Sequence, residues 1–415
     1  MLMKKTILML PSWYPTKENS FNGCFFREQA LELKNNFNFI VINYSKKCYF
    51  PIIYLFRTLF CKTKPKIEYI QNDEGLEEYS LFDFGIKFIF FDELYSKILL
   101  KIKKNKHGIG KIENPLHEKI LKSHIRYLKT KKMIPDFNLV YSLTAQDMAY
   151  LGHNICTVYK TPHITAEHAP FPWPGFVLSN KIVEAIESAD AFLAISNDKI
   201  RQVLLQNVQV TPIWVGNFCN ETKFHLSNSS HIIPTFLIVA ANSFYKNYPL
   251  FIKAMEELKS IAVKNFKIII AGYNANKGYS ENAKNLENMI KNSTIASNTQ
   301  MIEAVERNDI PALYNKCDVF VMTSIQEGLP VSALEASMSG LPVFSTRCGG
   351  VEDYVDDNMG RIFDITDYKG IANACNDYLN GKIKFDSKYI REHAVSLFGK
   401  EAFTERMKGI FEKII

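Results

Sequence analysis

The chain has 415 residues, more than one ordinary hydrophobic core holds, and therefore predicts two domains. Apolar residues make up 47% and charged residues 22%, a balance typical of folded globular proteins and not of disordered ones. The formal net charge of +7 is modest and spread along the chain, so it does not indicate a nucleic-acid partner, although it is compatible with phosphorylated ligands or an anionic membrane.

The cysteines and the apolar runs bear on location. The eight cysteines form no C-x-x-C pair, and we expect reduced thiols in the cytoplasm. No stretch reaches the roughly 18 apolar residues of a membrane-spanning helix. The first apolar run, Thr6–Leu10, is shorter than the apolar region of a signal peptide and ends at Pro11. We interpret residues 5–10 as a buried first strand.

Gly23 stands just before the first predicted helix, which begins near Phe26 and precedes a strand over residues 39–43. A glycine there lets the backbone approach a phosphate closely, as in other strand–loop–helix sites. A plain turn glycine explains the same position, and the residues alone leave both interpretations open.

Residues 48–130 give the weakest patterns. The segments 52–60 and 95–106 are apolar and basic. The second predicts a basic amphipathic helix, which could lie on an anionic bilayer that carries a lipid-linked acceptor. An ordinary solvated helix with its apolar residues turned inward explains the same pattern, and we favour it.

Strands and helices alternate over residues 136–215, as in an open α/β sheet. The expected strands are 136–143, 162–168, 191–196 and 210–215, and the expected helices are 145–151, 181–189 and 198–205. His168 ends the second strand beside a Pro- and Trp-rich loop, where such sheets place ligand contacts. A structural histidine is the alternative. Glu167 and Trp173 are weaker candidates for acceptor contacts.

A second α/β pattern covers the rest of the chain. The expected strands are 236–241, 266–271, 299–305, 318–323, 341–345 and 361–363, with helices at 250–259, 309–318, 331–338 and after residue 363. Lys246 lies between the first of these strands and its helix, where a point charge can neutralise a diphosphate. A solvated loop lysine is the alternative.

Two carboxylates bracket the start of helix 331–338: Glu327 in the preceding turn and Glu335 within the helix. Their spacing corresponds to roughly 12 Å along a helix. Because this is wider than the roughly 5–9.5 Å of a glycosidase pair, it suits two contacts along one extended ligand. Alternatively, Glu335 closes a capping box with Ser332 and Glu327 is a solvated loop acid.

The segment Ser324-x-x-Glu327-Gly328-Leu329-Pro330, with Glu335 further on, then Gly340-Leu-Pro-Val and Gly349–Gly350, resembles the donor-site signature of family 4 glycosyltransferases. These are retaining enzymes with the GT-B fold. The resemblance implies that Glu327 and the amides of Gly328 and Leu329 hold hydroxyls of the donor sugar, and that Glu335 holds the nucleotide ribose. Exposed N–H groups at a helix start suit such a site.

The resemblance extends to the other candidates. Pro-x-x-x-Pro, followed by Gly23-x-Phe25-x-x-Glu28-Gln29-Ala30, resembles the family's opening, whose glycine loop faces the donor diphosphate and the acceptor. His168 stands where the family has a histidine facing the donor sugar. Lys246 matches a lysine that, with helix-start amides, would stabilise charge on the leaving diphosphate.

The chain departs from the family pattern at three places. Ala241 stands where an arginine is frequent, so one of two usual cations is missing. Glu303 replaces a frequent glycine in the segment that contacts the base, which leaves the nucleotide open. In the interdomain turn GNFCNETKF, Phe218 and Asn220 replace the usual glycine and aspartate, which concerns a hinge and not the chemistry.

We therefore predict a GT-B fold, with two Rossmann-like doubly wound domains facing across a cleft. Residues 1–225 form the acceptor-side domain, and residues 226–395 form the nucleotide-sugar domain. Residues 396–415 form a C-terminal helix that returns to the first domain.

The predicted function is retaining transfer of a hexose-type sugar from a nucleotide diphosphate sugar, a co-substrate, to a glycan or lipid-linked acceptor in cell-surface polysaccharide synthesis. No other cofactor is expected, and no required metal, because no Asp-x-Asp motif stands at a suitable strand end. The expected location is cytoplasmic, and segment 95–106 leaves peripheral contact with the inner membrane face open.

Two alternatives remain: an epimerase or hydrolase on the same scaffold, and a catalytically degenerate nucleotide-sugar-binding protein. An NAD-dependent dehydrogenase is disfavoured because no G-x-G-x-x-G follows the first strand.

Overall fold

The computed structural model describes residues 4–16, 22–45, 66–71, 76–82, 115–172, 178–226, 231–275 and 280–415. The chain forms two compact units, one of Met1–Val215 with Thr404–Ile415 and the other of Gly216–Phe403. The chain passes to the second unit after Val215, and residues 217–224 form hydrogen bonds within that unit. The Asn217 side chain donates to the Leu329 carbonyl (2.8 Å), and the Arg391 guanidinium donates to the Glu221 carbonyl (2.8 Å).

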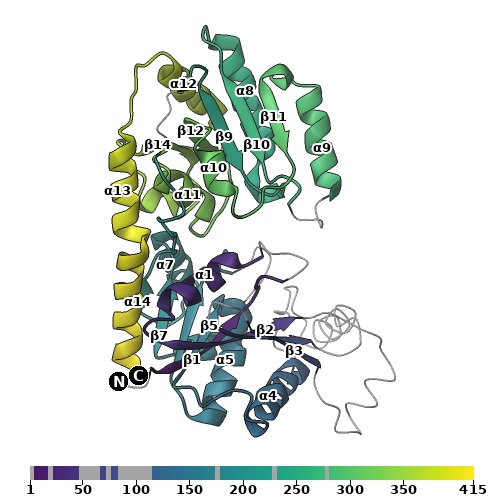
Figure 1. The fold of residues 1–415 in the computed structure, drawn as a ribbon, viewed down its shortest axis with the longest axis vertical. Coiled ribbons are helices and arrows are strands. Elements are labelled where there is room, and N and C mark those ends of the chain that lie inside the picture. The colour runs from purple at the N-terminus through teal and green to yellow at the C-terminus, as the bar shows by residue number, and fades with distance from the viewer. Residues whose placement is uncertain are drawn as a thin grey trace. The chain divides into compact units, whose positions relative to one another are not determined.

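The described part of the N-terminal unit contains an eight-stranded sheet in the order β3-β4-β2-β1-β5-β6-β7-β8 (Figure 1). The strands are β1 Thr6–Pro11, β2 Asn38–Ser45, β3 Lys66–Gln71, β4 Glu77–Phe82, β5 Leu139–Leu143, β6 His163–Glu167, β7 Ala191–Ala194 and β8 Pro212–Trp214. Every pairing is parallel except that of β3 with β4. The central strands β1, β5 and β6 are buried along their whole length, as parallel strands covered on both faces require.

Helices of this unit follow the strands they connect. They are α1 Cys24–Leu33, α4 Pro115–Thr130, α5 Ala145–Tyr159, α6 Asn180–Glu187 and α7 Asn197–Leu204. The last helix, α14 Lys400–Ile414, contributes its residues from Thr404 onward. Its Phe411 ring packs edge-on against Phe37 and Tyr141, with ring centroids 5.4 Å apart in both pairs.

The C-terminal unit contains, among the residues described, a six-stranded parallel sheet in the order β11-β10-β9-β12-β13-β14. The strands are β9 Thr235–Val239, β10 Lys267–Ala271, β11 Thr299–Ile302, β12 Val319–Met322, β13 Val343–Thr346 and β14 Gly360–Phe363. The helices are α8 Tyr248–Ile261, α9 Ser280–Lys291, α10 Ile310–Tyr314, α11 Val331–Met338, α12 Tyr368–Leu379 and α13 Ser387–Phe398, with short 3-10 turns at Phe244–Lys246, Ala296–Asn298 and Val351–Asp353.

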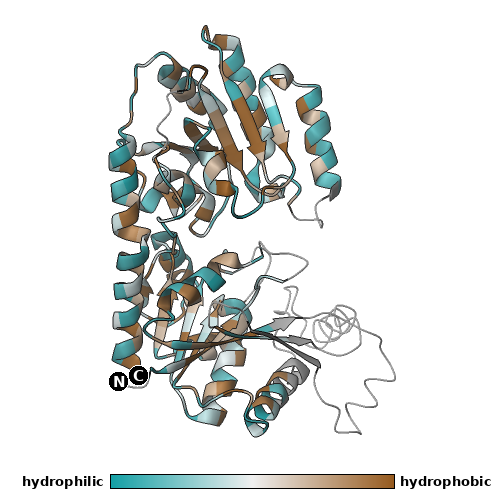
Figure 2. Cartoon of the chain, viewed as in Figure 1, coloured by the Kyte–Doolittle hydropathy of each residue, from teal (hydrophilic) through white to brown (hydrophobic). Residues whose placement is uncertain are grey.

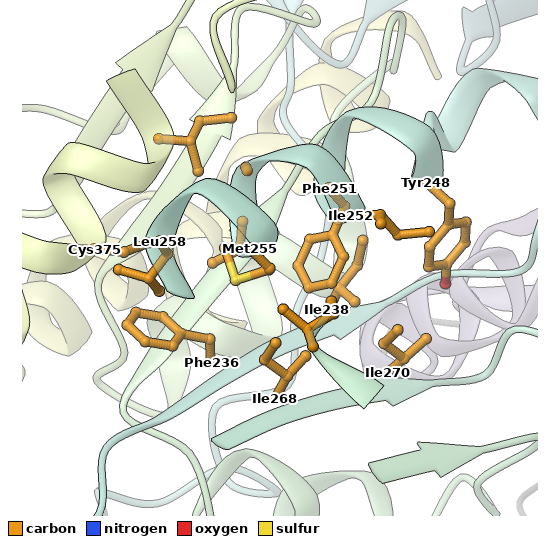
Figure 3. Close-up of a cluster of buried hydrophobic side chains, with 14 of the residues drawn as sticks. Phe236, Ile238, Tyr248, Phe251, Ile252, Met255, Leu258, Ile268, Ile270 and Cys375 are labelled. Carbon is orange, nitrogen blue, oxygen red and sulfur yellow. The ribbon is translucent and has the colours of Figure 1, made fainter. Parts of the chain in front are cut away.

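One face of this sheet carries the main hydrophobic core of the unit. On α8, Phe251, Met255 and Leu258 point toward apolar side chains of β9 and β10, including Phe236 and Ile268 (Figure 3). Figure 2 shows the corresponding apolar colouring along these strands. Helices α9 and α12 pack into the same cluster, so the face is closed by amphipathic helices and the sheet is rigidly supported.

The prediction of two doubly wound parallel sheets is confirmed. Helix 331–338 has the predicted bounds, whereas α5 runs on to Tyr159 and β11 ends earlier, at Ile302. Helix α9 was not predicted, because its sequence is rich in Asn and Lys and has low mean hydropathy. The basic segments 52–60 and 95–106 lie outside the described residues. No helix in the described part of the chain is long and apolar enough to cross a bilayer.

Candidate active site

The strand order of the C-terminal sheet indicates where a ligand binds. β9 is the first strand of its unit, yet it lies between β10 and β12, so the order of connections reverses between β9 and β12. Open α/β sheets bind ligands beyond the carboxyl ends of the strands at such a switch point. The loop after β9 carries Lys246, and the loop after β12 carries Glu327. The topology therefore brings two predicted site residues to one place.

Lys246 and Glu327 form an ion pair. Lys246 Nζ lies 2.6 Å from Glu327 Oε1, and the exposed fractions of the two side chains are 27% and 13%. Neither is the solvated loop residue that the plainer interpretation expects. The pair presents one cation and one further carboxylate oxygen at the carboxyl edge of the sheet. This is the chemistry needed to hold an anion beside a polyhydroxylated group.

Backbone contacts also hold these two loops together. The Ile325 N–H donates to the Tyr245 carbonyl at 2.7 Å. Thr323 Oγ1 lies 3.1 and 3.2 Å from the carbonyl oxygens of Lys246 and Asn247. The ion pair is thus supported by neighbouring hydrogen bonds and does not depend on two flexible side chains alone.

Gly350 fixes the turn that follows Glu327. The Gly350 φ is +74°, and a Cβ there would overlap the Gly328 carbonyl oxygen and lie 2.9 Å from Leu329 Cα. The Glu327 N–H donates to the Cys348 carbonyl at 2.7 Å. Only glycine allows so close an approach at this φ. The glycine pair of the sequence motif therefore supports the Gly328–Leu329 turn from behind.

The turn leads directly into α11. Pro330 is the N-cap residue, and no side chain caps the helix. The first N–H groups of a helix lack partners within the helix, so an uncapped start offers donors to a ligand. The Leu329 carbonyl accepts from the Asn217 side chain at 2.8 Å, which fixes the direction of the last peptide before the helix.

Glu335 lies in the interior of α11 and is buried. Its Oε1 pairs with Arg307 Nη1, and its Oε2 lies 3.2 Å from the hydroxyl of Tyr314. The capping-box alternative is wrong, because the helix begins at Pro330 without a side-chain cap and Glu335 turns to other partners. Glu335 is therefore a buried carboxylate paired with a cation and not a capping residue.

In the N-terminal unit, Gly23 and His168 lie at neighbouring positions. Gly23 is the N-cap residue of α1 with a φ of +67°, and a Cβ there would lie 2.5 Å from the Trp13 carbonyl oxygen. The His168 ring contacts the rings of Phe26 (4.8 Å between centroids) and Phe25 (6.0 Å), which open α1. Burial lowers the pKa of His168 to about 3, so the imidazole is neutral at physiological pH.

Glu167 is fully buried beside His168. Its Oε1 accepts the N–H groups of His168 (2.8 Å) and Ala169 (2.7 Å), and its Oε2 accepts that of Gln146 (3.3 Å). Burial raises the pKa of Glu167 to about 8, while these donors oppose the rise. Glu167 therefore orders the peptide after β6. It is not directed at an acceptor, as one interpretation of the sequence suggests.

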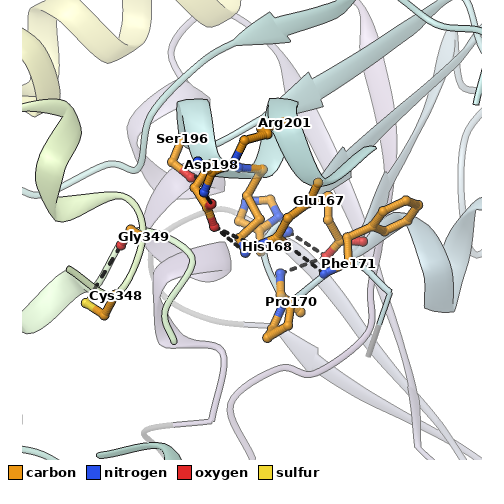
Figure 4. Close-up of polar contacts among 12 residues, drawn as sticks. Glu167, His168, Pro170, Phe171, Ser196, Asp198, Arg201, Cys348 and Gly349 are labelled. Carbon is orange, nitrogen blue, oxygen red and sulfur yellow. Dashed lines mark hydrogen bonds and ion pairs between the residues drawn. The ribbon is translucent and has the colours of Figure 1, made fainter. Parts of the chain in front are cut away.

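A buried lysine accompanies this cluster and is not apparent from the sequence. Lys199 is fully buried, and its Nζ donates to Gln202 Oε1 at 2.8 Å. Gln202 Oε1 also accepts the N–H of Phe171. Figure 4 shows Glu167, His168 and the residues near Asp198 gathered in this region. Trp173 lies outside the described residues.

Comparison with known proteins agrees with this geometry. Residues 225–394 match the model of the family described as glycosyl transferases group 1. The matched segment contains Lys246, Glu327 and Glu335, and it lies entirely within the C-terminal unit.

Curated relatives resemble short parts of the chain. Spore coat protein SA of Bacillus subtilis (strain 168) is 34% identical over 117 residues, which are 27% of this chain and 31% of that protein. The UDP-Gal:alpha-D-GlcNAc-diphosphoundecaprenol alpha-1,3-galactosyltransferase of Escherichia coli is 30% identical over 107 residues, 25% of this chain and 28% of that protein. The chain thus matches about a third of the length of these relatives.

A solved structure resembles the whole chain. Anabaena HepE in complex with UDP has a TM-score of 0.69 and 14% sequence identity, and the match covers 99% of this chain and 100% of that one. At this identity the likeness establishes the fold alone. The GT-B prediction is confirmed.

The sequence did not reveal every residue of the candidate site. Arg307, Tyr314 and Asn217 were missed, because each acts through a contact between segments far apart in the sequence. Glu303 stands where the family frequently has a glycine. Its carboxylate accepts from the Asn274 side chain at 3.0 Å, so the loop after β11 carries a hydrogen-bonded side chain at this position.

Proposed function

We propose that this protein is a retaining glycosyltransferase that moves a hexose-type sugar from a nucleotide diphosphate sugar to a glycan or lipid-linked acceptor in cell-surface polysaccharide synthesis. The observation that carries the proposal is the Lys246–Glu327 pair at the switch point of the sheet that matches the group 1 model, with Glu335 in helix α11, which follows Glu327. One cation and two carboxylates match the three parts of one extended donor: Glu327 the sugar, Lys246 the diphosphate that links sugar and ribose, and Glu335 the ribose.

Each residue then has a role. Lys246 and the first N–H groups of α11 stabilise the charge that develops on the leaving diphosphate, which is electrostatic catalysis by preorganised groups. Glu327 accepts from sugar hydroxyls, and the amides of Gly328 and Leu329 donate to them. The neutral His168 offers a hydrogen bond at the reacting face of the sugar. Gly23 leaves its loop open to the diphosphate and the acceptor.

The relatives support the choice of substrate class. The E. coli relative is named for a UDP-sugar donor and a diphosphoundecaprenol-linked acceptor, and the HepE structure contains UDP. Neither name fixes the substrates of this chain. Transfer to a lipid-linked acceptor would place the protein at the inner face of a membrane without requiring a spanning helix. Independence from metal ions is part of the proposal.

The experiment is a thermal-shift panel of UDP-, GDP- and ADP-sugars on the wild type and on Glu335→Ala, followed by nucleotide release with and without acceptor. Ligand at about 100 times its Kd stabilises by about 2.7 kcal/mol. We expect one nucleotide class to raise Tm and Glu335→Ala to weaken that response. Release that needs the acceptor supports transfer. Turnover of the donor alone would favour an epimerase or hydrolase, and binding without any turnover would favour a degenerate binding protein.

A further inference from the structure

The carboxyl edge of the C-terminal sheet contains few cations. In the described parts of the loops that follow β9 to β14 at this edge, the lysines and arginines are Lys246, Arg307 and Arg347. Lys246 forms an ion pair with Glu327. Arg307 forms one with Glu335. Each pair by itself has no net charge, so neither offers the excess positive charge that attracts the two phosphate groups of a nucleotide sugar.

Arg347 differs from the other two cations. It follows β13 directly and is exposed. Its backbone N–H donates to the Phe363 carbonyl at 2.7 Å, which continues the pairing of β13 with β14 and fixes the backbone at this position. Among the residues that the structure describes, its guanidinium has no hydrogen-bond or ion-pair partner. The five N–H donors of this group are therefore available to an anion that arrives from the solvent.

The loop of Arg347 lies against the loop of Glu327. Cys348, the next residue, accepts the Glu327 N–H on its carbonyl at 2.7 Å. Thr346, the preceding residue, donates from Oγ1 to the Ser324 carbonyl at 2.6 Å. Both chain neighbours of Arg347 are thus bonded to the 324–327 turn, and consecutive Cα atoms are only about 3.8 Å apart. The long side chain of Arg347 can therefore reach a ligand that Glu327 holds.

The position of Glu327 decides which phosphate is nearest to Arg347. In the proposed function, Glu327 holds hydroxyls of the donor sugar and Glu335 holds the ribose at the other end of the diphosphate. The phosphate bonded to the sugar is therefore the one closer to Glu327 and to the loop of Arg347. Phosphate oxygens accept two parallel hydrogen bonds from a planar guanidinium, which a lysine cannot provide.

We propose that Arg347 binds the sugar-linked phosphate of the donor, as a second cation beside Lys246. Its guanidinium donates to oxygens of this phosphate and supplies the positive charge that the Lys246–Glu327 pair lacks. This inference rests on the proposed function, which identifies the ligand as a nucleotide diphosphate sugar. The plainer alternative is an arginine that stays solvated at the surface, and it predicts that removal of the guanidinium leaves nucleotide binding unchanged.

The chain offers a matched control for the charge of Arg347. Lys267, the first residue of β10, is exposed at the opposite edge of the same sheet. It too has no ion-pair partner within the described part of the chain. Lys267→Met and Arg347→Met each remove one positive charge from the same unit, but only Arg347→Met changes the carboxyl edge. Arg347→Lys keeps the charge and removes the planar fork.

The test is isothermal titration calorimetry on the full chain. UDP, GDP and ADP are titrated first, to find the nucleoside diphosphate that binds the wild type. The corresponding nucleoside monophosphate, which lacks the sugar-linked phosphate, is then compared with it in the wild type and in the three variants. Thermal unfolding of each variant shows whether it is folded.

We expect the wild type to prefer the diphosphate to the monophosphate. Arg347→Met should weaken binding of the diphosphate about tenfold, the factor of one charge-assisted hydrogen bond, and should change binding of the monophosphate by about twofold or less. Arg347→Lys should restore part of the loss, and Lys267→Met should leave both affinities unchanged. A loss caused by net charge alone would also appear in Lys267→Met.

The outcomes separate this inference from the proposed function. If none of the three diphosphates binds the wild type, the proposed function fails and the role of Arg347 fails with it. If the wild type binds and a folded Arg347→Met binds as tightly as Lys267→Met, the inference alone is overturned. Equal losses for the diphosphate and the monophosphate would also overturn it, because they would indicate a structural role in the loop. Should Arg347→Met fail to fold, an unchanged preference of Arg347→Lys for the diphosphate would overturn the inference instead.

Discussion

Replacing Gly350 with alanine should loosen the Gly328–Leu329 turn, which we propose holds the donor sugar. The new Cβ would overlap the Gly328 carbonyl and lie 2.9 Å from Leu329 Cα, so this turn must move by about 1 Å to restore ordinary contact. The backbone of Gly350 (φ +74°, ψ −36°) lies outside the regions that alanine readily adopts, which adds strain of about 1–3 kcal/mol. With about 1–3 kcal/mol for the overpacked contact, we expect Gly350→Ala to lower the free energy of unfolding by about 3 kcal/mol.

The chain offers a matched control in Gly381. Its φ is +72°, nearly that of Gly350, but an added Cβ would meet nothing within 4 Å. Gly381→Ala therefore carries the backbone strain without the contact and should lower the free energy of unfolding by about 1 kcal/mol. The two variants share a positive φ, and only Gly350→Ala adds a contact with the turn.

Urea titrations of the full chain would measure both free energies, and calorimetry would measure nucleotide-sugar binding. We expect Gly350→Ala to weaken donor binding about tenfold, equivalent to about 1.4 kcal/mol, and Gly381→Ala to leave it unchanged. Equal losses of stability in the two variants, together with wild-type binding by Gly350→Ala, would refute the idea that this glycine positions the Gly328–Leu329 turn.

Further predictions concern charge, pH and metal. Lys246→Met should lower kcat/KM about 10²-fold. Because the two groups are paired, the double variant Lys246→Met/Glu327→Gln should lose much less kcat/KM than the product of the two single losses. Steady-state kinetics in which the two losses multiply would contradict this. His168→Gln should lower kcat about 10²-fold without changing the pH profile between pH 5 and 7, since burial already keeps the pKa of His168 near 3; a lost titration step near pH 6.5 would show that the wild-type imidazole ionises. The folded pKa of Glu167, about 8, is above its ordinary value of 4.5, so its contribution to stability is full below about pH 4.5 and is lost as the pH rises toward 8. Stability of the wild type relative to Glu167→Gln, from urea titrations across this range, should therefore fall with pH, and a flat difference would argue against a buried proton. EDTA should leave the transfer rate unchanged, and loss of activity that Mg²⁺ or Mn²⁺ restores would end the metal-independent mechanism.

The sequence predicted those parts of the site that short-range patterns determine. Lys246 and Glu327 each follow a buried strand, and parallel strands end at one edge of a sheet, so both residues could be assigned to one region. That they form an ion pair depends on β9 lying directly beside β12, which is a choice of strand order that neither strand encodes by itself. The local sequence pattern thus predicts the strands and helices, whereas the strand order, which decides which loops are neighbours, is known only from the structure.

Arg307 shows why the rest could not be predicted. An arginine in a polar loop is normally solvated, and nothing around residue 307 differs from such a loop. Its importance arises only when α11 buries Glu335 against the same loop. Lys199 is a similar case, because its helix has a polar sequence and yet the side chain is fully enclosed. Whether a charged side chain is buried depends on tertiary packing, and the periodicity of the sequence does not indicate it.

The chain passes from the first unit to the second after Val215 and returns to the first at Thr404, which has a consequence for synthesis of the protein. The N-terminal unit contains both Phe37, made early, and Phe411, whose ring packs against it. Domains usually fold as they emerge from the ribosome, one after another. Here the first unit keeps part of its apolar surface uncovered until residues 404–415 have been translated, which happens only after the whole C-terminal unit has been translated. A nascent chain halted anywhere in the second unit would therefore present an unfinished first domain to chaperones and proteases.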